Sequence, residues 1–209
     1  MPSETRSVNS FIDAARRAQI LACAIETIAE EGYLRASVVR IAQRAGISRG
    51  VITYRYPGKH DLVLDLITEI YVTAARIMLP AVDAAPASAG KLAAYIRSNG
   101  AFIDTHRAHA MTVLDVWTSF RTDDGQRLDQ LLATHPVPPE LARLDPGWIL
   151  REGQERGEFG NFPVRSTSTA LRGAIDGAVL QLSQDPAFDV TGYIEDLVHL
   201  FDRATRSDR

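Results

Sequence analysis

The chain has 209 residues, of which 45% are hydrophobic and 23% charged, and a formal net charge of −3 at pH 7. This length and composition suffice to bury a core in one large or two small domains, as in an ordinary soluble protein. The single cysteine, Cys23, excludes an intrachain disulfide and a cysteine-based zinc site, and its apolar neighbours make it a small core residue rather than a redox centre. Neither a signal peptide nor a membrane-spanning apolar run is recognisable, so we expect a cytoplasmic protein.

Positive charge is concentrated near the N-terminus. Residues 1–60 contain nine Lys and Arg against five Asp and Glu, whereas residues 61–209 contain fourteen against twenty-one. Such an asymmetry favours a polyanionic partner for the first part and argues against one for the rest. Within residues 35–59 no acidic residue interrupts the basic ones, which are Arg35, Arg40, Arg44, Arg49, Arg55 and Lys59.

The first helix is predicted over residues 10–31, after a flexible arm at residues 1–9. Apolar residues recur there at helical spacing, Ser10 is a candidate N-cap, and Gly32 can end the helix. This helix would provide the surface on which the next two pack.

Two short helices follow, joined by a glycine turn. Ser37 is expected to cap a helix that runs to about Ala45, Gly46 to make the turn, and Ser48 to cap a helix that runs to about Tyr54. A helix, a short turn and a basic second helix are the arrangement that enters the major groove of DNA. The sequence therefore predicts a helix-turn-helix.

The rest of the chain also has a helical pattern. Leu62, Leu66, Ile70 and Ala74 predict a helix over residues 59–79 that Pro80 ends, and the small residues of 81–90 suggest a linker. Further helices are predicted over 91–106, 108–121, 126–134, 140–156 with a kink near Pro146, 165–184 and 190–206. Since no strand pattern or repeat occurs, we expect an all-α fold of about nine helices.

The N-terminal motifs resemble those of TetR-type transcriptional regulators. The shared pattern comprises Ile20-Leu21 through Glu31-Gly32, then Ile41-Ala-x-x-Ala-Gly46-Ile-Ser48, then Tyr56-Pro-Gly-Lys59-x-x-Leu62. The resemblance implies a three-helix DNA-binding domain in residues 1–60 and a helical effector-binding and dimerisation domain in 61–209. It also implies a homodimer that binds an operator in double-stranded DNA.

The resemblance assigns DNA contacts, by position, to Ser37, Ser48, Arg49, Thr53, Tyr54, Arg55 and Lys59. Ser37 and Lys59 would lie at phosphates, and the stretch from Thr53 to Arg55 would read bases, because Arg can fork to a guanine edge and Thr can meet a thymine methyl. Thr53 stands where the family commonly has an aromatic residue, Arg55 where it often has His, and Tyr56 where it usually has Phe. The operator sequence is therefore open, and Tyr56 is expected to pack the hinge onto the first helix. Each arginine alone could equally be a solvated charge.

A small-molecule effector is expected between the central helices, as the resemblance implies. Aromatic and apolar side chains with a few polar groups line typical pockets, although the same residues also build an ordinary helical core. The candidates are Phe102, His106, Met111, Leu114, Trp117, Phe120, Trp148 and Asp176. Arg121 could help Asp176 to orient a polar ligand, or both could form ordinary ion pairs. His106 and His109 have metal-ligand spacing, but nothing completes a set, so no metal is expected.

The last two predicted helices carry broad apolar stripes, formed by Leu171, Ile175, Val179, Leu182, Ile194, Leu197, Val198 and Phe201. By resemblance, two copies of each helix form a four-helix dimer interface. Gly173 and Gly177 permit a close approach of helices, or they are tolerated within the core of one chain.

Three functions follow from these observations. The first is a repressor that an effector releases from a palindromic operator by tilting the helix over residues 59–79. The second is an activator with the same fold. The third is an all-helical enzyme, or a protein that interacts with partners other than DNA, whose basic N-terminus is incidental. No Gly-rich phosphate loop, nucleophile elbow or acid–base pair occurs, so we expect neither catalytic residues nor a cofactor.

Overall fold

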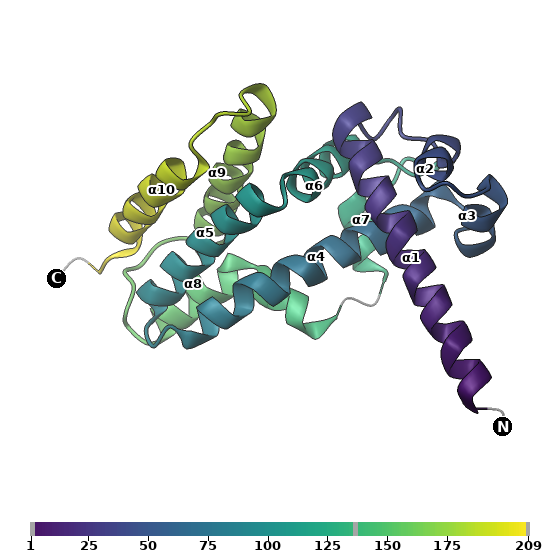
Figure 1. Ribbon diagram of the computed structural model, residues 1–209. Coiled ribbons are helices and arrows are strands. Elements are labelled where there is room, and N and C mark those ends of the chain that lie inside the picture. The colour runs from purple at the N-terminus through teal and green to yellow at the C-terminus, as the bar shows by residue number, and fades with distance from the viewer. Residues whose placement is uncertain (1–2, 136–137, 208–209) are drawn as a thin grey trace. The chain divides into compact units, whose positions relative to one another are not determined.

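The computed structural model describes residues 3–135 and 138–207, and these residues form ten α-helices and one 3-10 helix (Figure 1). The fold is all-α, as predicted. The chain divides into two compact units, Met1–Glu69 with Asp115–Thr134 and Ile70–Leu114 with His135–Arg209. The helices α4 and α6 contribute residues to both. None of the helices in the described part of the chain combines the length and the hydropathy that crossing a bilayer requires.

The first unit is built on the N-terminal helices. It contains α1 (Ser3–Glu31), α2 (Val38–Arg44), α3 (Arg49–Arg55), the beginning of α4 (Lys59–Ala84), the end of α6 (Arg107–Ser119) and α7 (Leu128–Ala133). Its core is apolar, and Ile20, Ile41, Ile52 and Leu66 are each at most 2% exposed. Because α1, α2, α3 and α4 each supply one of these side chains, burial of a common core fixes the short helices against the long ones.

The first helix is longer than its apolar pattern predicts. It begins at Ser3, so residues 3–9 are helical rather than a flexible arm, while Met1 and Pro2 lie outside the described residues. No proline or glycine interrupts the sequence from Ser3 to Glu31, and a helix can therefore extend beyond its buried part. It ends where predicted, because Gly32 takes a φ of +83° and donates its N–H to the Ile28 carbonyl at 2.8 Å.

The second unit packs the remaining helices around α5. These helices are α5 (Ser88–Thr105), η1 (Pro139–Leu144), α8 (Pro146–Glu155), α9 (Val164–Gln184) and α10 (Val190–Thr205), with the end of α4 and the beginning of α6. Helix α5 contacts α8, α9 and α10 (Figure 1). Gly100 makes the approach of α10 close, since a Cβ there would lie 2.6 Å from Ile194 Cγ1.

The predicted end of the fourth helix and the predicted linker are both wrong. Helix α4 continues through Pro80 to Ala84, and α5 begins at Ser88, so only residues 85–87 separate the two helices. Met78 and Val82, on either side of the proline, are 3% and 2% exposed. Their burial offsets the one helical hydrogen bond that proline removes.

Candidate functional site

The helix-turn-helix has the predicted geometry. The Ser37 hydroxyl accepts a hydrogen bond from the Arg40 N–H at 3.3 Å, and the turn after α2 contains Gly46, whose φ is +63°. Ser48 has the extended backbone of an N-cap, although its side chain makes no capping bond. Two helices of seven residues each are thereby held by a short turn, with Ile52 of α3 completely buried.

The outward side of α3 exposes side chains that can reach DNA. Tyr54 is 93% exposed, and Arg49 and Thr53 are exposed as well. Arg49 makes no ion pair or hydrogen bond through its side chain with any residue that the structure describes. The Thr53 hydroxyl donates to the backbone carbonyls of Arg49 and Gly50 at 3.3 Å, which leaves its methyl group for an apolar contact. This side of α3 offers a cation, a phenol and a methyl group.

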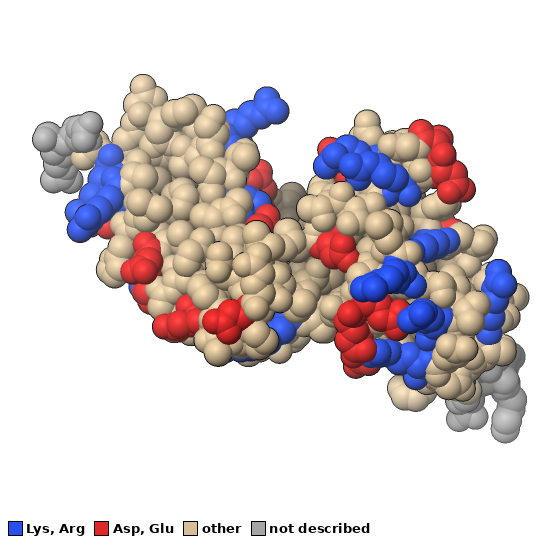
Figure 2. Space-filling view, turned by 90° about the horizontal axis from the view of Figure 1, so that it is seen from above, with Lys and Arg blue, Asp and Glu red and all other residues tan. Residues whose placement is uncertain are grey.

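Several arginines of the basic stretch are neutralised by carboxylates of α1. Arg40 pairs with Glu31, and Arg44 pairs with Glu30 and, at 3.3 Å, with Glu26. The Arg44 guanidinium lowers the pKa of the Glu30 carboxyl. In Figure 2 the right-hand part of the surface accordingly shows acidic residues in red among the basic ones in blue. The local absence of acids in the sequence therefore overstates the positive field of this unit.

Arg55 also faces α1 rather than the outward side of α3. Its Nη1 pairs with Asp13 Oδ1, and its Cζ lies 5.9 Å from the centre of the Tyr56 ring. Only 25% of the Arg55 side chain is exposed. The structure thus holds Arg55 between α1 and the end of α3, where the sequence predicted a side chain that reads bases.

The Lys59 ammonium group makes contacts within the chain. Its Nζ donates to the Tyr33 carbonyl at 2.8 Å and lies 4.0 Å from the centre of the Tyr33 ring. Burial lowers the pKa of Lys59, although nearby Asp115 opposes this effect. An ammonium group has three donors, so Lys59 retains the capacity to meet a phosphate at the beginning of α4.

A cluster that the sequence pattern did not reveal joins α1, α3 and α4. Asp65 accepts from Arg17 Nη2 and from the Tyr56 hydroxyl, both at 2.6 Å, and Arg17 Nη1 donates to Glu69 at 2.8 Å. Desolvation alone would raise the pKa of Asp65, but the bonds from Arg17 and Tyr56 outweigh it and lower that pKa. Tyr56 is 6% exposed, so it is held by this hydroxyl as well as by packing. No sequence signal links residues 48 positions apart.

The predicted effector residues are divided between the two units. Phe120 is completely buried in the first unit, where its ring lies 5.9 Å from that of Tyr33, and Trp117 belongs to the same unit. Arg121 is exposed and donates to the Phe120 carbonyl at 2.5 Å. The other candidates belong to the second unit: Phe102, His106, Met111, Leu114, Trp148 and Asp176.

Within the second unit these candidates form separate contacts. The rings of Phe102 and His106 stack at 5.0 Å, and His109 lies edge-on to His106 at 5.3 Å. Asp176 pairs with Arg172 at 3.0 Å, and Arg172 in turn donates to the Tyr95 hydroxyl at 3.1 Å. In the part of the chain that the structure describes, no three His, Cys, Asp or Glu side chains gather in a way that could hold a metal ion.

The apolar stripes predicted to form a dimer interface are buried within one chain. Their eight residues are between 0% and 7% exposed, and they face the core of the second unit: Leu171, Ile175, Val179, Leu182, Ile194, Leu197, Val198 and Phe201. The helical spacing was correct, but it identified the inward side of α9 and α10. The eight stripe residues therefore belong to the core of one chain, and the dimer interface stays a prediction.

Comparisons with known proteins agree with this geometry. Residues 20–66 match the family described as bacterial regulatory proteins, tetR family. The fatty acid metabolism regulator protein of Bacillus subtilis is 26% identical over 185 residues, which cover 87% of this chain and 91% of that protein.

Two solved structures share the fold. The regulator FadR from Bacillus subtilis, in complex with stearoyl-CoA, has a TM-score of 0.73 at 24% identity, covering 88% of this chain and 96% of FadR. A regulator from Saccharomonospora viridis, in complex with choline, has a TM-score of 0.68 at 21% identity, covering 93% of this chain and 99% of that one. With the helix-turn-helix that they form, residues 20–66 are a DNA-binding domain of the tetR family of bacterial regulatory proteins, and most of the chain is similar to a transcriptional regulator.

Proposed function

We propose that the protein is a repressor that binds a near-palindromic operator as a homodimer and leaves it when an effector binds. The exposed surface of α3 carries this proposal, because Tyr54 is 93% exposed and Arg49, on the same helix, is exposed without a partner among the described residues. Arg49, Thr53 and Tyr54 would read bases, whereas Ser37, Ser48 and Lys59 would contact phosphates. Arg55 would contribute little to DNA binding, because Asp13 already balances its charge.

The dimer would form through the exposed side of α9 and α10. Leu180 is 49% and Leu200 is 58% exposed, and a Cβ added to Gly173 would meet nothing within 4 Å. Figure 2 shows that this part of the surface is mostly uncharged. Exposed leucines beside a glycine would allow two copies to approach closely and bury apolar area. Leu200→Glu should shift sedimentation toward the monomer at micromolar concentration; an unchanged dimer would exclude α10 from the interface.

An acyl-CoA is the effector class that the comparisons favour. One Bacillus subtilis protein named above is a fatty acid metabolism regulator, and FadR from the same organism was solved with stearoyl-CoA. This chain spans nearly the whole length of both. Choline, bound by the Saccharomonospora viridis protein, is the competing class. Titration of stearoyl-CoA and choline into the protein, with thermal shift as the readout, separates the two. Stabilisation by choline alone would contradict the proposal.

The effector would act through α4, which contains residues of both units. Residues 1–60 would form the DNA-binding domain and 61–209 the effector and dimerisation domain of a cytoplasmic protein. Binding of the effector to the later part of α4 would change the separation of the two DNA-binding domains of the dimer. This requires the effector to bind more tightly to the DNA-free conformation. An effector that binds without lowering operator affinity would contradict this mechanism.

The operator can be identified by selecting bound sequences from random DNA. A dimer predicts two inverted half-sites separated by about one helical turn, ~34–36 Å, or a multiple of it. A reporter gene behind the selected operator then separates repression from activation: we expect expression to rise when the regulator gene is deleted. A fall would show an activator, and the absence of any enriched sequence would favour an interaction protein that does not read DNA.

A further inference from the structure

A groove of about 330 Å³ follows one flank of α4 in the second unit. Val72, Ala75, Leu79 and Pro80 provide its apolar lining, and its charged groups are Arg76 and Asp83 of α4 with Arg143 of η1. Positions three or four residues apart share one side of a helix, so these residues form a continuous stripe. From residue 72 to 83 the stripe is roughly 16 Å long at the usual helical rise. The groove is therefore elongated, with charge at its middle and at one end.

Arg76 provides the uncompensated charge of this groove. It is exposed, and its guanidinium makes no ion pair or hydrogen bond with any residue between 3 and 207 that the structure describes. Pro80, four residues later, has no N–H, so the Arg76 carbonyl also lacks its usual helical donor. The middle of the groove thus offers a cation next to apolar side chains.

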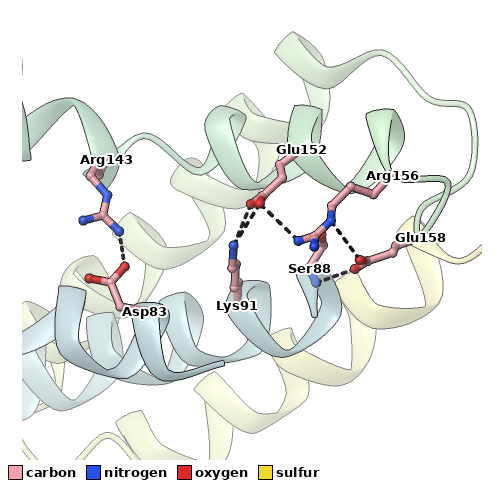
Figure 3. A network of polar contacts seen from close by, with 7 residues as sticks. All are labelled: Asp83, Ser88, Lys91, Arg143, Glu152, Arg156 and Glu158. Carbon is pink, nitrogen blue, oxygen red and sulfur yellow. Dashed lines mark hydrogen bonds and ion pairs between the residues drawn. The ribbon is translucent and has the colours of Figure 1, made fainter. Parts of the chain in front are cut away.

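Arg143 supplies the second cation, at the end of the groove. Figure 3 shows it reaching from η1 to Asp83, with which it forms an ion pair. Its Cζ lies 5.6 Å from the centre of the Trp148 ring, and Lys91 Nζ lies 5.2 Å from the same ring. The Arg143 side chain remains 38% exposed. Arg143 therefore makes a cation–π contact with the Trp148 ring and is still accessible to a ligand.

The polar groups next to the groove compensate one another. Lys91 pairs with Glu152 at 2.8 Å, and Glu158 pairs with Arg156 at 3.5 Å and accepts from the Ser88 N–H at 2.5 Å (Figure 3). These contacts tie the beginning of α5 to α8. Since Asp83 balances Arg143, the charge of Arg76 leaves the groove with one net positive charge at neutral pH.

We propose that this groove binds an effector in which an anionic group is attached to a long alkyl chain. Arg76 and Arg143 hold the anionic group through charge-assisted hydrogen bonds, and the stripe from Val72 to Pro80 contacts the alkyl part. The inference rests on the proposed effector class and specifies where it binds. A phosphate of an acyl-CoA and the carboxylate of a free fatty acid share this chemistry, so the test has to separate them. A choline head group, being cationic, does not fit.

Isothermal titration of the full-length protein with stearoyl-CoA, stearate and coenzyme A tests the proposal. Arg76→Gln should weaken the binding of stearoyl-CoA about tenfold or more, because it removes a hydrogen bond to a charged group. The matched control is Arg165→Gln, an exposed arginine of the same unit that lies outside the groove and should stay within about twofold of the wild type. Leu79→Asn should weaken the binding of stearoyl-CoA but not that of coenzyme A. Circular dichroism should show that each variant is folded.

The outcomes are distinct. Tighter binding of stearoyl-CoA than of stearate identifies the phosphate as the anionic group, and the reverse order identifies the carboxylate. If Arg76→Gln and Arg165→Gln bind stearoyl-CoA with equal affinity, the groove is not the binding site, although the proposed effector class still holds. If the wild type binds none of the three probes, the effector class and the groove both fail, and operator binding by the same preparation shows whether the DNA-binding function survives.

Discussion

Arg49 and Arg55 lie on the same short helix but should contribute very differently to DNA binding. Arg49 is exposed without a partner in the described residues, whereas Arg55 is paired with Asp13. A charge-assisted contact contributes roughly 1.5–3 kcal/mol, so Arg49→Ala should weaken operator binding about tenfold or more per protomer. Arg55→Ala should change affinity less than about threefold, because its charge is already balanced.

Asp13→Asn provides the reciprocal test. It releases Arg55 and removes a negative charge from the side of α1, so affinity for DNA of any sequence should rise. Each new phosphate contact should steepen the slope of log affinity against log salt by about 0.9. Fluorescence anisotropy with labelled operator and scrambled DNA, at four salt concentrations, measures all three variants. Equal losses of operator affinity in Arg49→Ala and Arg55→Ala, with an unchanged salt slope in Asp13→Asn, would refute the different roles proposed for the two arginines.

Two further predictions concern stability. Asp65→Asn should lower the free energy of unfolding at pH 7 by about 1–3 kcal/mol, since it leaves Arg17 without its main partner. The folded pKa of Asp65 is lowered, so its contribution is complete above the unfolded pKa of about 4 and is lost as pH falls through the folded pKa; the variant should therefore show a weaker loss of stability in acid. Urea titrations at several pH values measure this, and equal pH dependence in both proteins would contradict it. Gly153→Ala should cost about 1–3 kcal/mol because the new Cβ would lie 2.1 Å from the Phe159 ring. The control Gly173→Ala, with open space around it, should stabilise the isolated chain by up to about 1 kcal/mol, and equal melting temperatures for the two variants would contradict the packing argument.

The helix-turn-helix could be predicted because its signals are local. Ser37, Gly46 and the apolar Ile41 and Ile52 lie within one short segment, and each acts on its immediate neighbours. The charge of the reading surface could not be predicted in the same way. Its neutralising partners are distant in sequence, as with Asp13, which is 42 residues from Arg55. Counting charges within a window misses partners that only the fold brings near.

Two other errors have physical causes. Pro80 is a helix breaker in isolation, but burial of Met78 and Val82 carries α4 past it. The apolar stripes of α9 and α10 have the spacing of any buried helix side, so periodicity alone could not distinguish a core from a dimer interface. The groove beside Arg76 escaped prediction because its lining combines α4 with η1, about 60 residues away in the chain.

Binding of the full-length protein to its selected operator, compared between Tyr54→Ala and Lys59→Ala, tests most directly that the outward side of α3 reads DNA. If it does, Tyr54→Ala lowers the affinity for the operator far more than the affinity for scrambled DNA. Lys59→Ala lowers both affinities similarly and reduces the slope of log affinity against log salt. Equal affinity of the wild type and Tyr54→Ala for the operator, with the same preference over scrambled DNA, would contradict this reading surface.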